Sequence, residues 1–418
     1  MPVDNATETS GLLGPLRRYR SARLLLGQLI SRFGDAIYLV GVAAYAVQRH
    51  DGGLLAGALL GQSVGAVATL TISGAITDRV GARRMLILAD LLRLAGLIGT
   101  VLFCQQGMAG YALFLGLGLL LGIGDGMFEP ALTVALTEVL PAPMLLSANT
   151  LHSIFLRGGT MVGAAFAGVL LIFTNPLVTL IVDATTFGIS LLLMVCTQWL
   201  ARPSADQEEP LFRSALHGLR YVLARAWLTV SIATFALFVA LAVSAPRVLL
   251  PLSLSEGGGN TASYGWVLAA QGFGAMATGL AAAWLPSSAR PAATIFRCLV
   301  LVSVCCGLLG LAHQVTVAAV VAAIGGGALS LGTIYWATLV QRNVAPAFLA
   351  RVSSSDWLVS SGLAPVSLAV MPWLLSLSSA SHLLILFGLI SGLVSVGGLC
   401  LPSIRHLRYA DQGGSDGI

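Results

Sequence analysis

Lysine is absent from the chain, and charge of either sign is scarce. All 22 basic residues are arginine, and charged residues make up 9% of the 418 positions, against roughly 25% in an ordinary soluble domain. Without a lysine ammonium the chain cannot be a phosphate-loop ATPase, a pyridoxal enzyme or a retinal Schiff-base protein. The sparse charge excludes a water-soluble globule, and a net charge of +5 from so few residues excludes the dense basic face of a nucleic-acid binder.

Clustered metal ligands are also lacking. The six cysteines lie in or at the end of apolar runs, and the six histidines are scattered along the chain. Neither residue type has the spacing of a metal site, so we interpret the cysteines as small core residues and expect no metal and no cofactor. Gly61, Ser63 and Gly65 match a nucleophile elbow, but no strand precedes them. We therefore expect no enzyme activity.

Long apolar runs dominate the chain, of which 57% is hydrophobic. A run of about 20 apolar residues crosses the hydrocarbon core of a membrane as a helix. We therefore predict an all-α integral membrane protein with twelve transmembrane helices. The predicted spans are 24–48, 53–77, 85–105, 110–138, 146–173, 177–200, 227–250, 263–286, 291–312, 315–340, 354–376 and 381–402.

The arginines indicate the orientation of these spans. Four of them precede the first span and three lie between the second and third, where arginine marks the cytoplasmic side. With an even number of spans, both termini are expected in the cytoplasm. Residues 1–20 lack the apolar core of a cleaved signal peptide, so the first span is expected to remain as an anchor. The arginine-only, Ala- and Leu-rich composition is typical of a GC-rich bacterium, and we expect a multi-pass protein of the cytoplasmic (inner) membrane.

An internal repeat divides the chain into halves. The polar segment 201–226 separates an N-terminal half, 1–200, from a C-terminal half, 227–418. Five residues of the second span recur in the eighth at an offset of 209 residues. The pairs are Gln62 and Gln271, Gly65 and Gly274, Ala66 and Ala275, Ala68 and Ala277, and Thr69 and Thr278. Two six-helix halves with this kind of pseudosymmetry are typical of secondary transporters.

The segment between the second and third spans has a distinctive spacing of glycine, acid and arginine. Its residues are Gly74, Asp78, Arg79, Gly81, Arg83 and Arg84. This segment resembles the signature loop of the major facilitator superfamily. Gly81 permits a tight turn, and the carboxylate of Asp78 can hold arginines or a helix N-terminus of the other half as an inner-face latch. The corresponding segment of the second half, around Ser287 to Arg290, has no acid, so any latch is one-sided.

Further motifs resemble the twelve-helix drug-efflux branch of that superfamily. They comprise Arg32 to Asp35, Pro130-Ala131, Ala148-Asn149, Gly218 to Tyr221, Trp227-Leu228, and Gln341 to Pro346 with Arg351-Val352. The branch resembles exporters of macrolides, tetracyclines and siderophores, and also a lysophospholipid translocator. The resemblance implies a transporter that moves small amphipathic molecules.

A string of small residues in the fifth span resembles the antiporter motif of the same superfamily. Gly159, Gly163 and Gly168 keep its small-residue packing, but Ala164 stands where that motif has a proline. Small residues at such spacing let helices approach closely, whereas a proline would add a kink. Helix packing alone is an alternative explanation of the string.

Charged residues inside the spans are the strongest functional signal, because each costs about 2.5–3.5 kcal/mol in hydrocarbon. They concentrate in the first half. They are Arg32, Asp35, Asp90, Arg93, Asp125, Glu129, Arg157 and Asp183, whereas the second half has no acid deep in a span. A second repeat follows the fourth and tenth spans, where Val139, Pro141 and Ala142 recur as Val344, Pro346 and Ala347 at an offset of 205 residues. That offset places Ser330 and Ile334 at the positions of Asp125 and Glu129.

Two of these acids share one helix face, because Asp125 and Glu129 lie four residues apart. Neighbouring carboxylates favour protonation of one of them. We therefore predict Glu129 and Asp35 as proton-carrying acids, with Arg32 and Arg157 as their partners; Arg157 could neutralise the second acid. Asp90 and Arg93, three residues apart, are interpreted as a structural ion pair.

The resemblance implies that the first, fourth, seventh and tenth spans line the substrate cavity. Aromatic residues there could hold a flat or lipophilic ligand. The predicted substrate-binding residues are Tyr38, Phe128, Phe235, Phe238, Tyr335 and Trp336. Asp183 is a further candidate, either as a substrate contact or as a pore-rim residue.

The sequence thus predicts a proton-coupled exporter of amphipathic drugs or secondary metabolites that works by alternating access as a monomer. Its expected partners are the substrate, protons and the lipid bilayer, without a nucleotide or a nucleic acid. A lysophospholipid translocator or a siderophore exporter is the nearest alternative. A membrane scaffold or receptor would have no need for the buried carboxylates.

Overall fold

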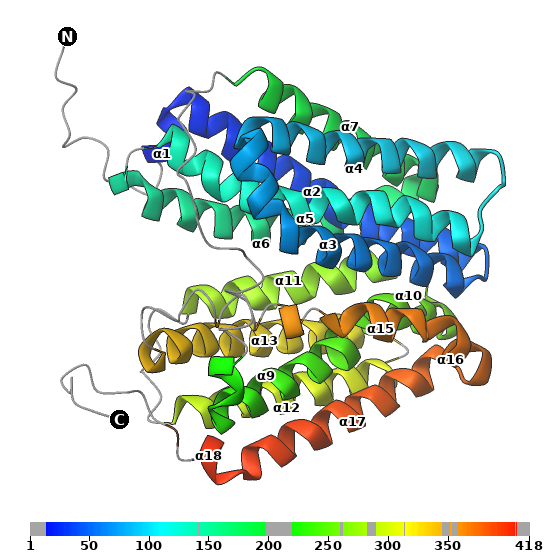
Figure 1. Ribbon diagram of the computed structural model, residues 1–418. Helices are drawn as coiled ribbons and strands as arrows, with labels where there is room; N and C mark the ends of the chain where they lie inside the picture. Colours follow the sequence, from blue (N-terminus) through cyan, green and yellow to red (C-terminus); the bar gives the residue numbers. More distant parts are fainter. Residues whose placement is uncertain are drawn as a thin grey trace, which may run out of the picture. The chain divides into compact units, whose positions relative to one another are not determined.

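The structure is a computed structural model that describes residues 14–140, 142–197, 220–259, 262–281, 290–312, 314–344, 352, 356, 358–360, 362–405 and 407. These residues form helices and connecting turns, without a strand (Figure 1). The all-α prediction is therefore confirmed. The chain divides into two compact units, Met1–Gln207 and Glu208–Ile418. Residues 201–219 of the predicted loop between the halves lie outside the described residues.

Unit 1 contains the first group of helices. They are α1 (Gly14–Arg17), α2 (Tyr19–Gln48), α3 (Gly52–Val80), α4 (Ala82–Gln105), α5 (Tyr111–Val139), α6 (Ala142–Phe173) and α7 (Pro176–Val195). Capping side chains fix two of the helix starts. Asp51 accepts from the backbone N–H of Gly53 at 2.9 Å, and Asn175 accepts from that of Val178 at 3.2 Å. Pro176 occupies the first turn of α7, where a missing N–H costs nothing.

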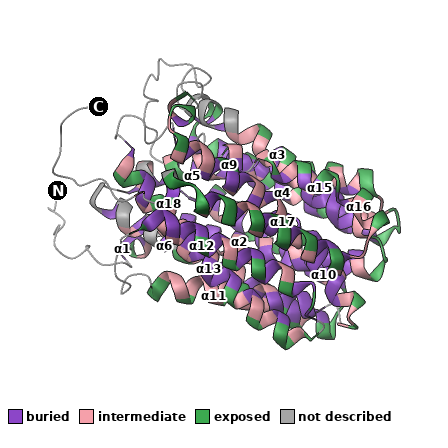
Figure 2. Ribbon diagram, turned by 90° about the horizontal axis from the view of Figure 1, so that it is seen from below, coloured by how far each residue is buried: buried purple, intermediate pink, exposed green. Residues whose placement is uncertain are grey.

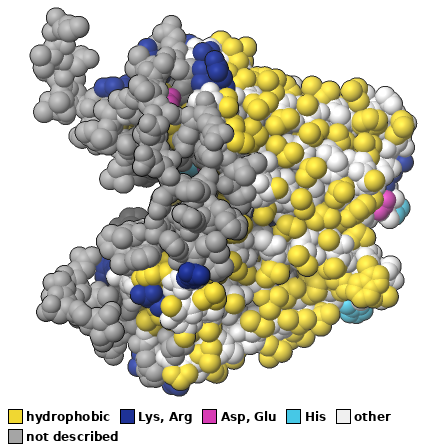
Figure 3. Space-filling view, in the orientation of Figure 1, with side chains coloured by type: hydrophobic (Ala, Val, Ile, Leu, Met, Phe, Trp, Pro, Cys, Tyr) yellow, Lys and Arg dark blue, Asp and Glu magenta, His cyan; other side chains and the backbone are white. Residues whose placement is uncertain are grey.

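Helix α4 shows how unit 1 arranges its polar and apolar faces. Leu88 and Leu91 are 44% and 46% exposed, whereas Asp90 and Arg93 are buried at 0% and 1%. Burial alternates in this way along many of the helices in Figure 2, and hydrophobic side chains cover much of the surface in Figure 3. An apolar outside around a charged inside is the arrangement expected in lipid, where exposed leucine costs nothing and charge faces the bundle interior.

Unit 2 contains the second group of helices. They are α9 (Ala226–Phe238), η1 (Val239–Ser244), α10 (Pro246–Glu256), α11 (Ser263–Ala281), α12 (Pro291–Leu309), α13 (Val315–Asn343), α15 (Ala364–Ala369), α16 (Met371–Leu377), α17 (Ala380–Cys400) and α18 (Pro402–Arg405). The seventh predicted span is thus interrupted by η1, a π-helical segment. At the end of α10, the carboxylate of Glu256 accepts from the backbone N–H of Ala380 at 3.1 Å and so caps α17.

The repeated residues of the two halves make equivalent helix–helix contacts in each unit. Helix α3 packs along α5 in unit 1, and α11 packs along α13 in unit 2. A Cβ atom added at Gly65 would meet the backbone of α5, and one added at Gly274 would meet the backbone of α13 at Ala323. The repeat therefore preserves a close helix contact that requires glycine.

Ten helices of the described residues are long and apolar enough to cross a membrane, and eleven are if a pair bent by 46° at Val370 counts as one span. The pair corresponds to the predicted span 354–376. The remaining prediction, span 263–286, coincides with α11, whose glycine, serine, threonine and glutamine residues make it less apolar. The structure thus supports a multi-pass helical membrane protein.

Candidate functional site

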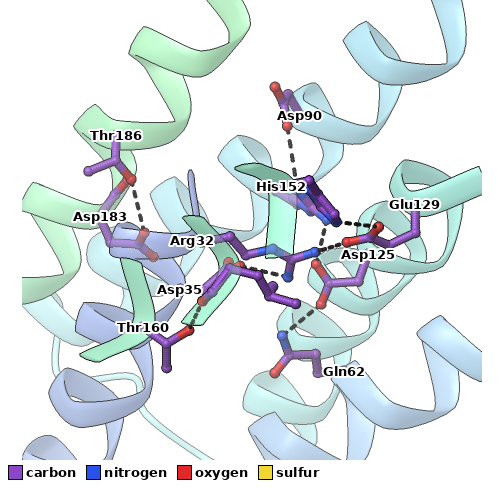
Figure 4. A network of polar contacts seen from close by, with 12 residues as sticks. Arg32, Asp35, Gln62, Asp90, Asp125, Glu129, His152, Thr160, Asp183 and Thr186 are labelled. Atoms are coloured by element: carbon purple, nitrogen blue, oxygen red, sulfur yellow. Dashed lines mark hydrogen bonds and ion pairs between the residues drawn. The ribbon is translucent and has the colours of Figure 1, made fainter. Parts of the chain in front are cut away.

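Arg32 on α2 lies at the centre of the first ion-pair cluster of unit 1 (Figure 4). Its Nη1 atom is 3.2 Å from Oδ2 of Asp35, one turn further along α2, and its Nη2 atom pairs with Oε1 of Glu129 on α5. The other carboxylate oxygen of Glu129 is 3.5 Å from Nε2 of His152 on α6. Three helices therefore converge on one guanidinium and its two acids.

Arg93 on α4 forms the second cluster. It is 1% exposed, and its guanidinium nitrogens lie 3.5 Å from Asp90 and 2.7 Å from Asp125. The same guanidinium stands over the rings of Phe128 and Phe187, at 4.6 and 5.4 Å from their centroids. Stacking on aromatic faces and forked pairing with carboxylates are both arginine chemistry. The predicted ion pair of Asp90 and Arg93 is confirmed, and it extends to a further acid.

Helix α5 joins the two clusters, because it carries both Asp125 and Glu129. Asp125 also accepts from Nε2 of Gln62 on α3 at 2.8 Å, and Asp90 accepts from the hydroxyl of Ser190 on α7 at 2.9 Å. The resulting polar network includes side chains from α2, α3, α4, α5, α6 and α7. It is named the unit 1 network below, and its members are Arg32, Asp35, Gln62, Asp90, Arg93, Asp125, Glu129, His152 and Ser190.

The two acids of α5 have partners beyond those predicted. Asp125 pairs with Arg93, and Glu129 pairs with Arg32 and lies beside His152, whereas the predicted role of Arg157 stays a prediction. The side chain of Arg157 is exposed. The pair of Arg93 with Asp90 follows from their three-residue spacing, which is visible in the sequence. The contact of Arg93 with Asp125 depends on how α4 packs on α5.

The glycines of the predicted antiporter-like motif bring α6 onto α2. A Cβ at Gly159 would lie 3.2 Å from Cβ of Arg32, and a Cβ at Gly163 would collide with the backbone of Phe33. Gly168 is buried further along α6. The motif thus packs against the stretch of α2 that carries Arg32 and Asp35.

The predicted substrate residues of unit 1 are all buried. Tyr38, Phe128 and Asp183 are 4%, 0% and 0% exposed. Phe128 packs under the guanidinium of Arg93. In this structure they pack inside unit 1 and do not line a surface open to a ligand.

Two of the predicted substrate residues of unit 2 share an apolar pocket. Phe235 on α9 and Trp336 on α13 line it together with Ser231, Ile295, Phe296, Leu299, Leu329, Gly332 and Thr333. The indole Nε1 of Trp336 donates to Oδ2 of Asp356 at 2.7 Å, which fixes the orientation of the ring. Phe238 stacks on Phe235 with centroids 5.9 Å apart, and Tyr335 packs against a neighbouring apolar cluster.

The predicted latch segment forms the turn between α3 and α4. Gly81 has a φ of +90°, which favours glycine, and its N–H donates to the carbonyl of Thr77 at 2.8 Å. Arg83 donates to the carbonyl of Val195 at 3.0 Å and so caps the C-terminus of α7, while Arg84 is exposed. Gly74, Asp78 and Arg79 belong to α3, but the side chains of Asp78 and Arg79 lie outside the described part.

Apolar helices around a buried network of ion pairs define the class of this protein, which is a multi-pass membrane transporter. A family model described as "Transmembrane secretion effector" matches residues 10–371. The chain belongs to this family and to the major facilitator superfamily of transporters. No match was found among curated proteins.

Solved transporter structures share the fold at low sequence identity. The nucleoside transporter NupG superposes with a TM-score of 0.74 at 10% identity, over 90% of this chain and 98% of its own. A bacterial homologue of the human lysosomal transporter Spinster gives 0.65 at 16% identity, over 94% and 99%. A D-xylose–proton symporter gives 0.65 at 14% identity, over 93% and 98%. These likenesses support the predicted major facilitator fold.

Proposed function

We propose that the protein is a proton-coupled exporter of amphipathic drugs or secondary metabolites in the cytoplasmic membrane of a bacterium, with both termini in the cytoplasm. The observation that carries this proposal is the charge inside unit 1. Away from the helix ends, its described residues include five acids, Asp35, Asp90, Asp125, Glu129 and Asp183, but three arginines, Arg32, Arg93 and Arg157. A surplus of buried acid favours the binding of protons or of a cationic substrate.

Glu129 is the acid best placed to exchange its proton. Its side chain is 41% exposed, against 26% for Asp35 and 23% for Asp125. It also forms the pair that ties α5 to Arg32 of α2, and His152 lies beside it. Protonation of Glu129 would remove this tie between two helices, so binding of a proton can bias their packing.

The energy available from protons is sufficient for export. At a membrane potential of roughly 150 mV, the entry of one proton releases about 3.5 kcal/mol, since 100 mV corresponds to about 2.3 kcal/mol per charge. That amount supports a gradient of two to three decades for a neutral substrate, at about 1.4 kcal/mol per decade.

The pocket in unit 2 supports an apolar, ring-bearing substrate. Its lining combines Phe235 and Trp336 with aliphatic side chains, and its polar members are the hydroxyls of Ser231 and Thr333. In this structure the pocket is too small for a substrate, so a ligand would bind there only after these side chains or helices move apart. Such a lining suits the apolar part of an amphipathic molecule better than a sugar, which needs many hydrogen bonds. Growth assays with a panel of amphipathic antibiotics and dyes, with and without expression, would identify a substrate; transport of lysophospholipids or siderophores instead would replace the drug assignment.

A single substitution tests the coupling. In proteoliposomes, substrate-driven proton movement is expected to vanish in Glu129→Gln, because an amide keeps the size of the side chain but cannot carry a proton. Glu138→Gln, near the end of the same helix, is the matched control and should retain coupling. The readout is a pH-sensitive dye trapped in the vesicles. Full coupling in Glu129→Gln would refute the assignment of Glu129.

A further inference from the structure

Helices α2 and α7 pack along a seam of glycine and hydroxyl residues. Gly27, Gly34 and Gly41 recur every seven residues on α2, which keeps them on one helix face. A Cβ atom at each would meet side chains of α7: Ser190 and Met194 at Gly27, Asp183 and Thr186 at Gly34, and Thr179 at Gly41. All of these α7 side chains are buried.

An acid occupies the middle of this seam. Asp183 is 0% exposed, and its Oδ1 atom lies against Gly34, the residue before Asp35. The hydroxyl of Thr186 donates to the backbone carbonyl of Asp183 at 2.7 Å and also lies 3.3 Å from Oδ1. The carboxyl group therefore receives only the longer branch of a bifurcated hydrogen bond. Its Oδ2 atom is buried without a hydrogen-bond partner.

Asp183 differs from the other acids of unit 1 in its partners. Asp35 and Glu129 pair with Arg32, and Asp90 and Asp125 pair with Arg93. Away from their ends, the helices packed against α7 carry Arg32, Asp35 and Tyr38 on α2, Asp90 and Arg93 on α4, and His152 and Arg157 on α6. Among the described residues none of these arginines lies within ion-pair distance of Asp183. An ionised carboxylate in that position would lack both a cation and sufficient donors, which is far costlier than a neutral acid.

We propose that Asp183 is a second proton-binding site, which holds a proton while α2 and α7 are packed as in this structure and releases it during the transport cycle. The ligand is a proton, because a proton neutralises a carboxyl group whose only hydrogen-bond donor among the described residues is the hydroxyl of Thr186 and whose Oδ2 atom has no partner there. The role in transport rests on the proposed proton coupling, whereas the bound proton itself can be measured without transport.

Infrared spectroscopy of the purified protein tests whether the proton is bound. The wild-type spectrum at neutral pH should contain the C=O band of a protonated carboxyl group that is lost in Asp183→Asn. Asp90→Asn should leave that band in place, because Asp90 is paired with Arg93. If Asn fails to fold, Asp183→Ser serves instead, since Ser190 already fits this seam. Absence of the band in the wild type, or its survival in both variants, would overturn the proposal.

Reconstituted vesicles test whether the proton is released during transport. Asp183→Asn should lower the number of protons moved per exported molecule by one while transport stays proton-coupled. Glu129→Gln should abolish coupling altogether, because the pair of Glu129 with Arg32 is what links protonation to the packing of α2 and α5, so that without it neither acid drives transport. An unchanged proton-to-substrate ratio in Asp183→Asn would overturn the role in the cycle. A wild-type protein that exports without moving protons would refute the proposed function instead, and the infrared band would then still decide whether Asp183 binds a proton.

Discussion

Arg93 is the more deeply buried of the two arginines in the unit 1 network, with a side chain 2% exposed against 19% for Arg32. Its guanidinium meets two carboxylates and two aromatic rings at 1% exposure. A lysine could not reproduce this arrangement, because an ammonium is a point charge without a flat face or a fork of donors. The absence of lysine from the chain is consistent with sites that require the shape of arginine as well as its charge.

Removal of this cation is expected to destabilise the protein strongly. Arg93→Met keeps much of the volume but leaves Asp90 and Asp125 without their partner, and breaking a buried ion pair on one side costs about 3–5 kcal/mol. The measurement is chemical unfolding of purified protein in detergent. The matched control is Arg297→Met on α12, an exposed arginine whose loss should change stability by less than about 0.5 kcal/mol. Equal stability of the two variants would contradict the buried role of Arg93.

Contacts within one helix could be predicted from the sequence, whereas contacts between helices could not. Arg32 with Asp35, and Asp90 with Arg93, follow from the three-residue spacing. The pairing of Arg93 with Asp125 depends on the rotation and register of α4 and α5, which hydropathy does not determine. Arg32 is predicted as a partner of Glu129 from its charge and depth alone, and the structure supplies the contact between the two helices. In the sequence His152 is one of six scattered histidines, and its place beside Glu129 comes from the close approach of α6.

At the scale of the helix, glycine determines which surfaces meet. Gly34 has the most restricted surroundings of the α2 seam, because its missing side chain leaves room for the polar groups of Asp183 and Thr186. The seven-residue recurrence of Gly27, Gly34 and Gly41 could have been detected in the sequence, but three glycines in an apolar run do not reveal which partner helix they face.

Gly34→Ala is expected to push α2 and α7 apart. Its Cβ would overlap Asp183 and Thr186, and such overpacking typically costs about 1–3 kcal/mol. Gly158→Ala on α6 is the control, since a Cβ there meets nothing within 4 Å and alanine favours the helix. Thermal unfolding in detergent should show a lower midpoint for Gly34→Ala alone. A midpoint like that of the wild type would mean that the seam is looser than the structure shows.

At the scale of the whole molecule, the two halves share the glycine-dependent helix contacts of the repeat, but the second half lacks the acids found inside the first. Gln62 binds Asp125 in unit 1, whereas in unit 2 the repeat places Gln271 and Ser330 at the equivalent positions. The helix order and the halves are encoded in long apolar runs, and so the fold could be predicted. Specialisation of one half for charge was also visible in the sequence, but its pairing pattern emerged only from the packed helices.

The predicted topology can be tested with the protein's own cysteines. Cys196 after α7 and Cys400 at the end of α17 are exposed, and twelve spans with cytoplasmic termini place both on the cytoplasmic side. A membrane-impermeant maleimide should therefore label them in inside-out vesicles but not in intact cells. Gln106→Cys, after α4, should add labelling in intact cells. Labelling of Cys196 or Cys400 in intact cells would refute the orientation.

Each arginine of the unit 1 network is shared by two acids, Arg32 by Asp35 and Glu129, and Arg93 by Asp90 and Asp125. When either acid of a couple takes up a proton, the guanidinium keeps the other as its counterion. The interior can therefore change its total charge in single steps without exposing a bare cation to hydrocarbon. The network therefore acts as a charge buffer. Because each arginine has two acids, every intermediate protonation state inside the membrane avoids the energetic cost of an unpaired buried cation.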